Sequence, residues 1–216
     1  MNLRKKIHLY FWTLKFLKIE QILYRIKYLF SSVSRIKVIQ RPVILPSWTW
    51  SSPPFFVGCY DGKSTFNLLN KKIKFNGSIG WNDDSIEKLW LYNLHYFDDL
   101  NAIDSINRID AHHLLVKNWI ENNPLSAGGI GWEPYTLSIR LVNLIKWCSR
   151  LKIDDAEILE SIYSQAQVLS KTPEYHILGN HLFSNAKALM FVGHFFEGKV
   201  GEVFLNQANT LFDRGL

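Results

Sequence analysis

The sequence has little of what a disulfide framework, a metal cluster or a membrane span requires. Its 216 residues include only two cysteines, Cys59 and Cys148, which are too few for a disulfide scaffold and lack metal-ligand spacing. No stretch of roughly 20 uncharged apolar residues is present, so no spanning helix is predicted. The glycine-rich stretch 126–131 is not followed by Gly-Lys-Ser/Thr, so it is not a phosphate-binding loop. We therefore expect buried thiols, no cofactor and no metal.

Acidic residues are nearly absent from the first 41 residues, which hold ten lysines and arginines and one acid, Glu20. Apolar residues recur at helical spacing between Ile19 and Phe30, so residues 1–40 predict a basic amphipathic helical segment. Such a helix can dock on the domain, or residues 1–30 can contact an anionic membrane surface. A cleaved signal peptide is disfavoured because no small-residue cleavage site follows the first apolar run. No nucleic-acid-binding motif accompanies the charge, so no nucleic acid partner is expected.

Residues 41–80 predict an extended arm, because prolines there interrupt any continuous helix. Aromatic residues alternate with these prolines, and turns are expected at Asp61-Gly62 and Asn76-Gly77. Short strands are predicted at Phe55–Tyr60 and Phe75–Trp81.

Residues 81–216 predict helices joined by short connections, which pack as antiparallel pairs. Asn82, Asp83 or Ser85 can cap the first helix, and Asp154 or Asp155 can cap the fourth. The helices are expected at about 86–97, 105–121, 134–151, 178–196 and 202–212, with the fourth running from its cap to a break at Thr172-Pro173.

Three polar groups within this helical region are candidate site residues. The first is Asn180-His181, near a helix start where backbone donors favour an anion. An equal alternative is that Asn180 caps the helix and His181 is a satisfied buried imidazole. The second group is Asn93 and His95, on a helix whose aromatic residues are more often core than ligand platform.

The third group follows the glycine-rich stretch and contains Trp132, Tyr135 and Arg140. The two aromatic rings can stack on sugar rings, and the guanidinium can pair with a carboxylate. The alternative is a packed helix start in which Arg140 makes an ordinary salt bridge.

These groups, in this order, resemble the N-terminal domain of the heparinase II/III-like polysaccharide lyases. The resemblance covers most of residues 85–216, and the run Gly179-Asn180-His181-Leu182-Phe183-Ser184-Asn185-Ala186-Lys187-Ala188-Leu189 is its most specific part. It implies a mainly α fold, an incomplete (α/α) toroid of paired antiparallel helices. In the family a β-sandwich domain follows the toroid, and uronic-acid polysaccharides are cleaved by β-elimination.

The resemblance also implies roles for individual residues. Asn180 matches the amide that neutralises the uronate carboxylate, and His181 matches the adjacent imidazole that acts as base or stabiliser. The substrate contacts it implies are Asn93, His95, Trp132, Tyr135 and Arg140.

The sequence departs from the family because the tyrosine that acts as acid belongs to a later motif, and the sandwich residues are absent as well. We therefore expect a C-terminally truncated lyase domain, catalytically weak or inactive alone, whose partner is an anionic, uronate-containing polysaccharide. The alternatives are a carbohydrate-binding remnant without turnover and a membrane-peripheral protein. The expected location is cytoplasmic or membrane-peripheral, with the periplasm as the alternative.

Overall fold

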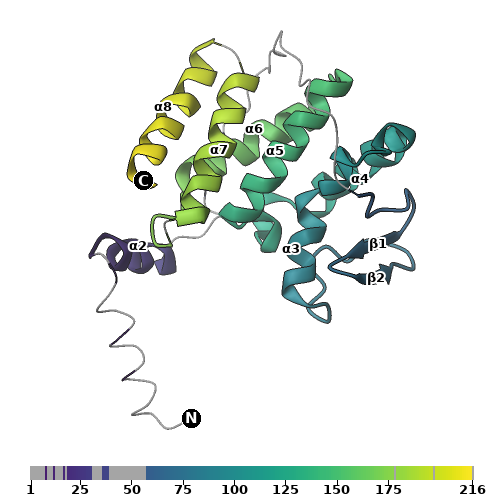
Figure 1. Cartoon of the computed structure of the whole chain (residues 1–216), viewed down its shortest axis with the longest axis horizontal. Helices are drawn as coiled ribbons and strands as arrows, with labels where there is room; N and C mark the ends of the chain where they lie inside the picture. Colours follow the sequence, from purple (N-terminus) through teal and green to yellow (C-terminus); the bar gives the residue numbers. More distant parts are fainter. Residues whose placement is uncertain are drawn as a thin grey trace.

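The computed structural model describes residues 8, 12, 17, 19–30, 36–38, 57–177, 179–196 and 198–215. Within these ranges the protein is mainly α-helical and has one two-stranded antiparallel sheet (Figure 1). The prediction of a mainly α protein is therefore confirmed. None of the helices in these ranges combines the length and the apolar character needed to cross a bilayer.

The helical region contains six α-helices joined by short connections and 3-10 turns. They are α3 (Lys88–Tyr96), α4 (Ile109–Asn122), α5 (Pro134–Leu151), α6 (Ala156–Lys171), α7 (Gly179–Phe195) and α8 (Gly198–Gly215). The 3-10 turns are η2 (Asp98–Asn101), η3 (Ser105–Arg108), η4 (Leu125–Ala127) and η5 (Ile130–Trp132). The N-terminal segment contributes α2 (Ile19–Phe30).

Local sequence signals account for several helix ends. Pro134 occupies the first turn of α5, where its missing N–H is not needed. Asp155 caps α6 by accepting hydrogen bonds from the N–H groups of Glu157 and Ile158. The predicted cap of α3 is wrong, because α3 begins only at Lys88 and its N-cap residue, Glu87, makes no side-chain capping bond.

The helices of the second half form adjoining layers. α6 packs against α5 and α7, α5 and α7 lie side by side, and α8 packs along α7 (Figure 1). Tyr135 at the start of α5 contacts His181 at the start of α7, and Lys146 farther along α5 contacts Phe191 farther along α7. α5 and α7 therefore run in the same direction, which brings their N-terminal ends together.

The strands lie at positions that the sequence analysis did not predict. β1 (Thr65–Leu68) pairs with β2 (Lys71–Lys74), whereas residues 75–81 form turns and irregular structure, and residues 57–59 are not a strand. Leu69 and Asn70, both at positive φ, form the two-residue turn between the strands. Phe66 and Leu68 are buried on the core side of β1, and Trp90 of α3 donates to the carbonyl of Lys71. The alternation of apolar residues in β1 was the signal for this hairpin.

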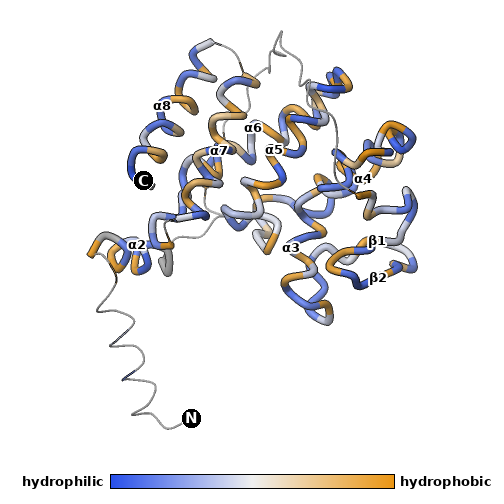
Figure 2. The backbone as a smooth tube through the Cα atoms, in the orientation of Figure 1, coloured by the Kyte–Doolittle hydropathy of each residue, from blue (hydrophilic) through white to orange (hydrophobic). Residues whose placement is uncertain are grey.

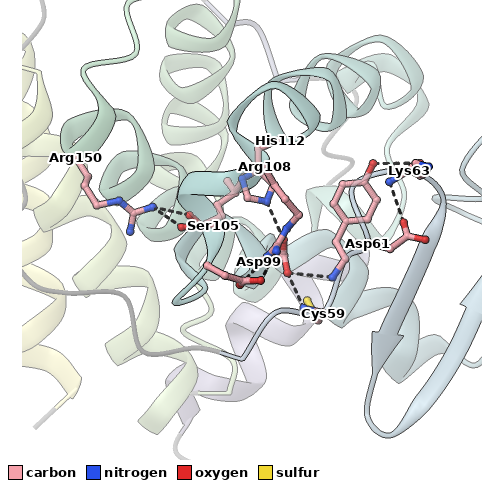
Figure 3. Close-up of polar contacts among 11 residues, drawn as sticks. Cys59, Asp61, Lys63, Asp99, Ser105, Arg108, His112 and Arg150 are labelled. Carbon is pink, nitrogen blue, oxygen red and sulfur yellow. Dashed lines mark hydrogen bonds and ion pairs between the residues drawn. The ribbon is translucent and has the colours of Figure 1, made fainter.

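Asp99 in η2 attaches the segment before the hairpin to the helical body (Figure 3). One carboxylate oxygen accepts the backbone N–H groups of Cys59 and Tyr60, at 2.5 and 3.0 Å. The other accepts from Arg108 at 3.0 Å and from His112 at 2.7 Å. Burial alone would raise the pKa of Asp99, but these bonds outweigh it and hold the pKa below its usual value. Cys59, although half-buried rather than buried, is an unreactive thiol because burial raises its pKa to about 12.

Candidate functional site

The N-terminal end of α7 holds a histidine that is oriented by a buried carboxylate. His181 Nδ1 lies 3.1 Å from Oε1 of Glu174, and the Glu174 side chain is buried whereas that of His181 is 38% exposed. Because Nδ1 donates to the carboxylate, Nε2 carries the lone pair on the opposite side of the ring. Burial raises the pKa of Glu174, although His181 and the hydrogen bond from Asn185 act in the opposite direction. This pair has the arrangement of an oriented general base.

A chain of hydrogen bonds fixes Glu174 in place. Its backbone N–H donates to Asn185 Oδ1 at 2.8 Å, and Asn185 Nδ2 donates to Glu174 Oε2 at 3.2 Å. Asn185 Nδ2 also donates to Ser138 Oγ at 2.9 Å, and Ser138 in turn donates to the carbonyl of Pro134. Asn185 and Ser138 are buried, so these bonds join α7, the turn before it and the start of α5 in a dry environment.

Aromatic rings from α5 and α3 form a wall beside His181. The Tyr135 ring lies 4.5 Å from the His181 ring, and Tyr96 meets Tyr135 edge-on at 6.3 Å. Tyr96 is half-buried, and burial together with the neighbouring Tyr135 raises its pKa, so it remains a neutral hydroxyl. A half-exposed aromatic wall next to an imidazole is suited to a sugar ring.

A neighbouring carboxylate, Glu133, is compensated by its own partners. It accepts from the Lys88 ammonium at 3.2 Å and from the Tyr92 hydroxyl. Its charge is thus paired and opposes an anionic ligand less than an isolated carboxylate would.

Asn180 is exposed, and its side-chain amide has no hydrogen-bond partner among the described residues. It therefore does not act as a side-chain cap within this part of the chain, and His181 is not a buried imidazole. Asn180, His181 and Tyr135 are the predicted site residues that the structure brings together. The structure shows no contact between Asn93 and these residues, and its amide donates to the Leu89 carbonyl of its own helix.

His95 and Arg140 lie in the interior, where protein groups satisfy their polar atoms. Trp119 donates to His95 Nδ1 at 2.8 Å, and His95 Nε2 lies 2.9 Å from the Trp81 carbonyl. The first bond fixes Nδ1 as acceptor, so Nε2 carries the proton. Burial lowers the pKa of His95 to about 3, with a smaller contribution from the charge of Arg140, and the ring is therefore neutral.

Arg140 makes three hydrogen bonds and no salt bridge within the described residues. It donates to Gln165 Oε1 at 2.8 Å and to the carbonyls of His95 and Gly131 at 3.3 and 2.5 Å. The guanidinium also lies 4.0 Å from the ring of Trp119, and burial lowers its pKa to about 9. The alternative prediction, an ordinary salt bridge of Arg140, is therefore wrong within the described residues.

Trp132 is buried as well, and its indole N–H donates to the Asn123 carbonyl. One edge of it lines a cavity of about 450 Å³ that also includes Trp119, Glu157 and Glu160. That cavity is a different place from the His181 cluster. Glu157 is paired with the Lys117 ammonium at 2.8 Å, but the cavity lining contains a second carboxylate, Glu160, and, among the described residues, no basic side chain, which makes it poorly suited to a uronate.

The glycine-rich stretch approaches protein side chains closely. A Cβ on Gly131 would lie 2.8 Å from His95 Nδ1, so this position requires glycine. The close approach to the backbone at Gly131 is thus made by the buried histidine of α3.

Sequence reasoning gave no role to Glu174, Asn185, Ser138 or Tyr96. Two signals were available: Glu174 belongs to the same stretch as Asn180 and His181, and Asn185 follows His181 by four residues, which places both on one helix face. The contribution of Ser138 and Tyr96 depends on the packing of α5 against α7 and α3, which has no signature in a single sequence.

No group of three or more histidine, cysteine or acidic side chains is placed to hold a metal ion in the described parts of the chain. Comparisons of the chain with models of protein families, with curated proteins and with solved structures found no match. Function is therefore inferred from the residues of the site.

Proposed function

We propose that the chain is the helical part of a polysaccharide lyase, an incomplete (α/α) toroid that binds a uronate-containing polysaccharide at Asn180, His181 and Tyr135. The observation that carries this proposal is the buried Glu174 carboxylate on Nδ1 of a half-exposed histidine. A general base needs this orientation, because its lone pair must point toward substrate while a fixed group holds the other side of the ring.

The proposed chemistry is β-elimination. The Asn180 amide and the backbone N–H groups at the start of α7 bind the uronate carboxylate, which acidifies the neighbouring C–H. His181 Nε2 takes that proton, a carbon–carbon double bond forms, and the glycosidic C–O bond breaks. The departing oxygen then needs a proton from an acid.

Basic residues farther along α7 support an extended anionic ligand. Lys187 follows Asn180 by seven residues, so it lies on the same face about 10 Å farther along the helix axis. Lys146 of α5 is near enough that burial and the charge of Lys187 together lower its pKa. Two neighbouring ammonium groups are stabilised when a polyanion lies across them.

A binding site without turnover is the second candidate. The sequence contains no tyrosine after Tyr175, so the acid of the later family motif is not among its residues. We therefore expect this chain by itself to bind the polysaccharide with little or no cleavage.

Two measurements test both candidates. Calorimetry measures the binding of alginate, heparan sulfate and hyaluronan, and ultraviolet absorbance detects the unsaturated uronate that cleavage would produce. We expect at least one polymer to bind. His181→Ala and Asn180→Ala should each weaken the affinity for that polymer about tenfold or more, which corresponds to the loss of one charge-assisted contact. His194→Ala is the matched control, because His194 is an exposed histidine at the far end of the same helix. Equal affinity in His181→Ala and His194→Ala, or no binding to any polymer, would contradict the proposal.

A further inference from the structure

The outward face of α2 carries a stripe of exposed aliphatic side chains. Ile19, Leu23 and Ile26 are 77%, 61% and 51% exposed, and their spacing of four and three residues places them on one side of the helix. Other large exposed aliphatic residues, such as Leu114 and Val203, lie singly on other helices. Among the described helices, α2 alone exposes three large aliphatic side chains in one row. Figure 2 shows apolar and polar residues alternating along α2.

The opposite face of α2 is attached to the protein at the turn that leads into α7. The ring of Tyr24 lies 4.5 Å from that of Tyr175, and Gln21 and Arg25 reach the carbonyls of Ile177 and His176. α2 therefore already has a docked face, and docking on the domain does not account for the aliphatic stripe. Figure 1 shows α2 at the corner of the molecule beneath α7 and α8, away from the hairpin.

The segment of the sequence that contains the stripe is strongly basic. Lys27 follows Leu23 by four residues and is exposed beside the stripe, and the first 41 residues contain ten basic residues and one acid. Trp12, upstream of α2, is also exposed, and tryptophan favours the interface between headgroups and acyl chains. An exposed aliphatic row with a lysine beside it, within a basic segment, matches the pattern of helices that lie in a membrane interface.

We propose that α2 binds the surface of an anionic lipid bilayer, with Ile19, Leu23 and Ile26 inserted among the acyl chains and basic side chains against the headgroups. A lipid surface is favoured over a protein partner because the apolar row is narrow and the excess positive charge extends over the whole segment around it. Since α2 contacts the turn that carries Glu174, this attachment holds the His181 cluster close to the membrane surface. The inference does not depend on the proposed lyase activity.

The test is co-sedimentation of the full chain with vesicles of phosphatidylcholine alone and with vesicles containing phosphatidylglycerol. We expect binding only to the anionic vesicles, and weaker binding as salt is raised. Leu23→Glu should reduce the partition coefficient about tenfold or more, because it places a carboxylate in the acyl region. Val203→Glu is the matched control, since Val203 is 64% exposed on α8, and it should bind like the parent chain.

A second substitution, Leu23→Ala, shortens the side chain without adding charge and favours helix, so it should give an intermediate loss. Equal binding of Leu23→Glu and Val203→Glu would overturn the proposal, as would failure of the parent chain to bind anionic vesicles. A second copy of the chain is the competing occupant of the stripe. If sedimentation equilibrium shows a dimer that Leu23→Glu dissociates while vesicle binding is unchanged, the stripe is an interface between copies and the lipid proposal is wrong.

Discussion

His95 and His181 lie in two regions of the molecule that treat the same side chain in opposite ways. The His95 ring is enclosed by Trp81, Trp119 and Gly131, and both ring nitrogens have partners in the protein. The His181 ring is half-exposed, and one nitrogen is held by Glu174 while the other makes no hydrogen bond to the described residues. The first region holds the fold together, and the second has bonding capacity left for a ligand.

The same difference separates other polar and charged groups of the two regions. Arg140 is buried, and carbonyl oxygens and an indole ring compensate the charge of its guanidinium. A substrate carboxylate cannot reach this guanidinium without opening the core. Asn180 and Lys187 lie on the accessible side of α7. Residue type alone thus does not identify a site, because burial decides whether a polar group is a structural partner or a ligand contact.

The largest expected effect is on the buried region. Arg140→Met removes the donors to Gln165 and to two backbone carbonyls and leaves these acceptors unsatisfied in the core. We expect the free energy of unfolding in urea to fall by about 3–5 kcal/mol. Arg150→Met on the same helix is the control, because Arg150 is half-exposed and bonds the Leu100 carbonyl and Ser105, and it should cost about 1–2 kcal/mol. Equal losses would mean that burial does not distinguish the two arginines.

His95 should also make stability depend on pH. Its pKa is about 3 in the folded protein and about 6.5 when unfolded. The unfolded state therefore binds an extra proton as pH falls below 6.5, and stability is lost progressively toward pH 3, by up to about 1.4 kcal/mol per pH unit.

Unfolding free energies measured from about pH 7 to 4, across this interval, check that dependence. His95→Gln remains neutral throughout, so its pH slope should be shallower than that of the parent chain, although the variant is less stable overall because Gln cannot reproduce both ring bonds. Parallel slopes in the two proteins would contradict the neutral, buried state of His95.

The helices could be predicted from the sequence because their signals are local. Proline at the first turn of α5, Asp155 as the cap of α6 and Pro173 after its end all act through the nearest backbone groups. The hairpin was misplaced because its turn, Leu69-Asn70, places a leucine at positive φ, which is an unusual choice for this turn type. Part of the predicted strand at 55–60 and of the proline-rich arm lies outside the described residues.

The site could be predicted only in part. Asn180 and His181 are adjacent in the chain, and Tyr135 joins them because α5 and α7 run in parallel. Trp132 and Arg140 belong to the same stretch as Tyr135, yet they point into the core. On a helix start, neighbouring residues face different directions, and a single sequence does not show which direction is occupied by other helices.

The smallest expected change in stability concerns His181. His181→Ala removes a half-exposed ring and one hydrogen bond to Glu174, while Asn185 continues to hold the carboxylate. We expect a loss of about 1 kcal/mol, against about 3 kcal/mol for His95→Ala, which also empties part of the core.

The loss in His181→Ala should shrink as pH falls. Burial already raises the pKa of Glu174, and loss of His181, whose hydrogen bond and electrostatic interaction both act to lower that pKa, raises it further. The folded variant therefore takes up a proton more readily than the unfolded chain, and protonation relieves the unpaired buried charge. Urea unfolding of the parent and His181→Ala at two pH values, one on each side of the ordinary carboxyl range near 4, measures this change. A loss that grows on acidification would show that Glu174 does not depend on His181 for its charge, and the oriented base would lose its physical basis.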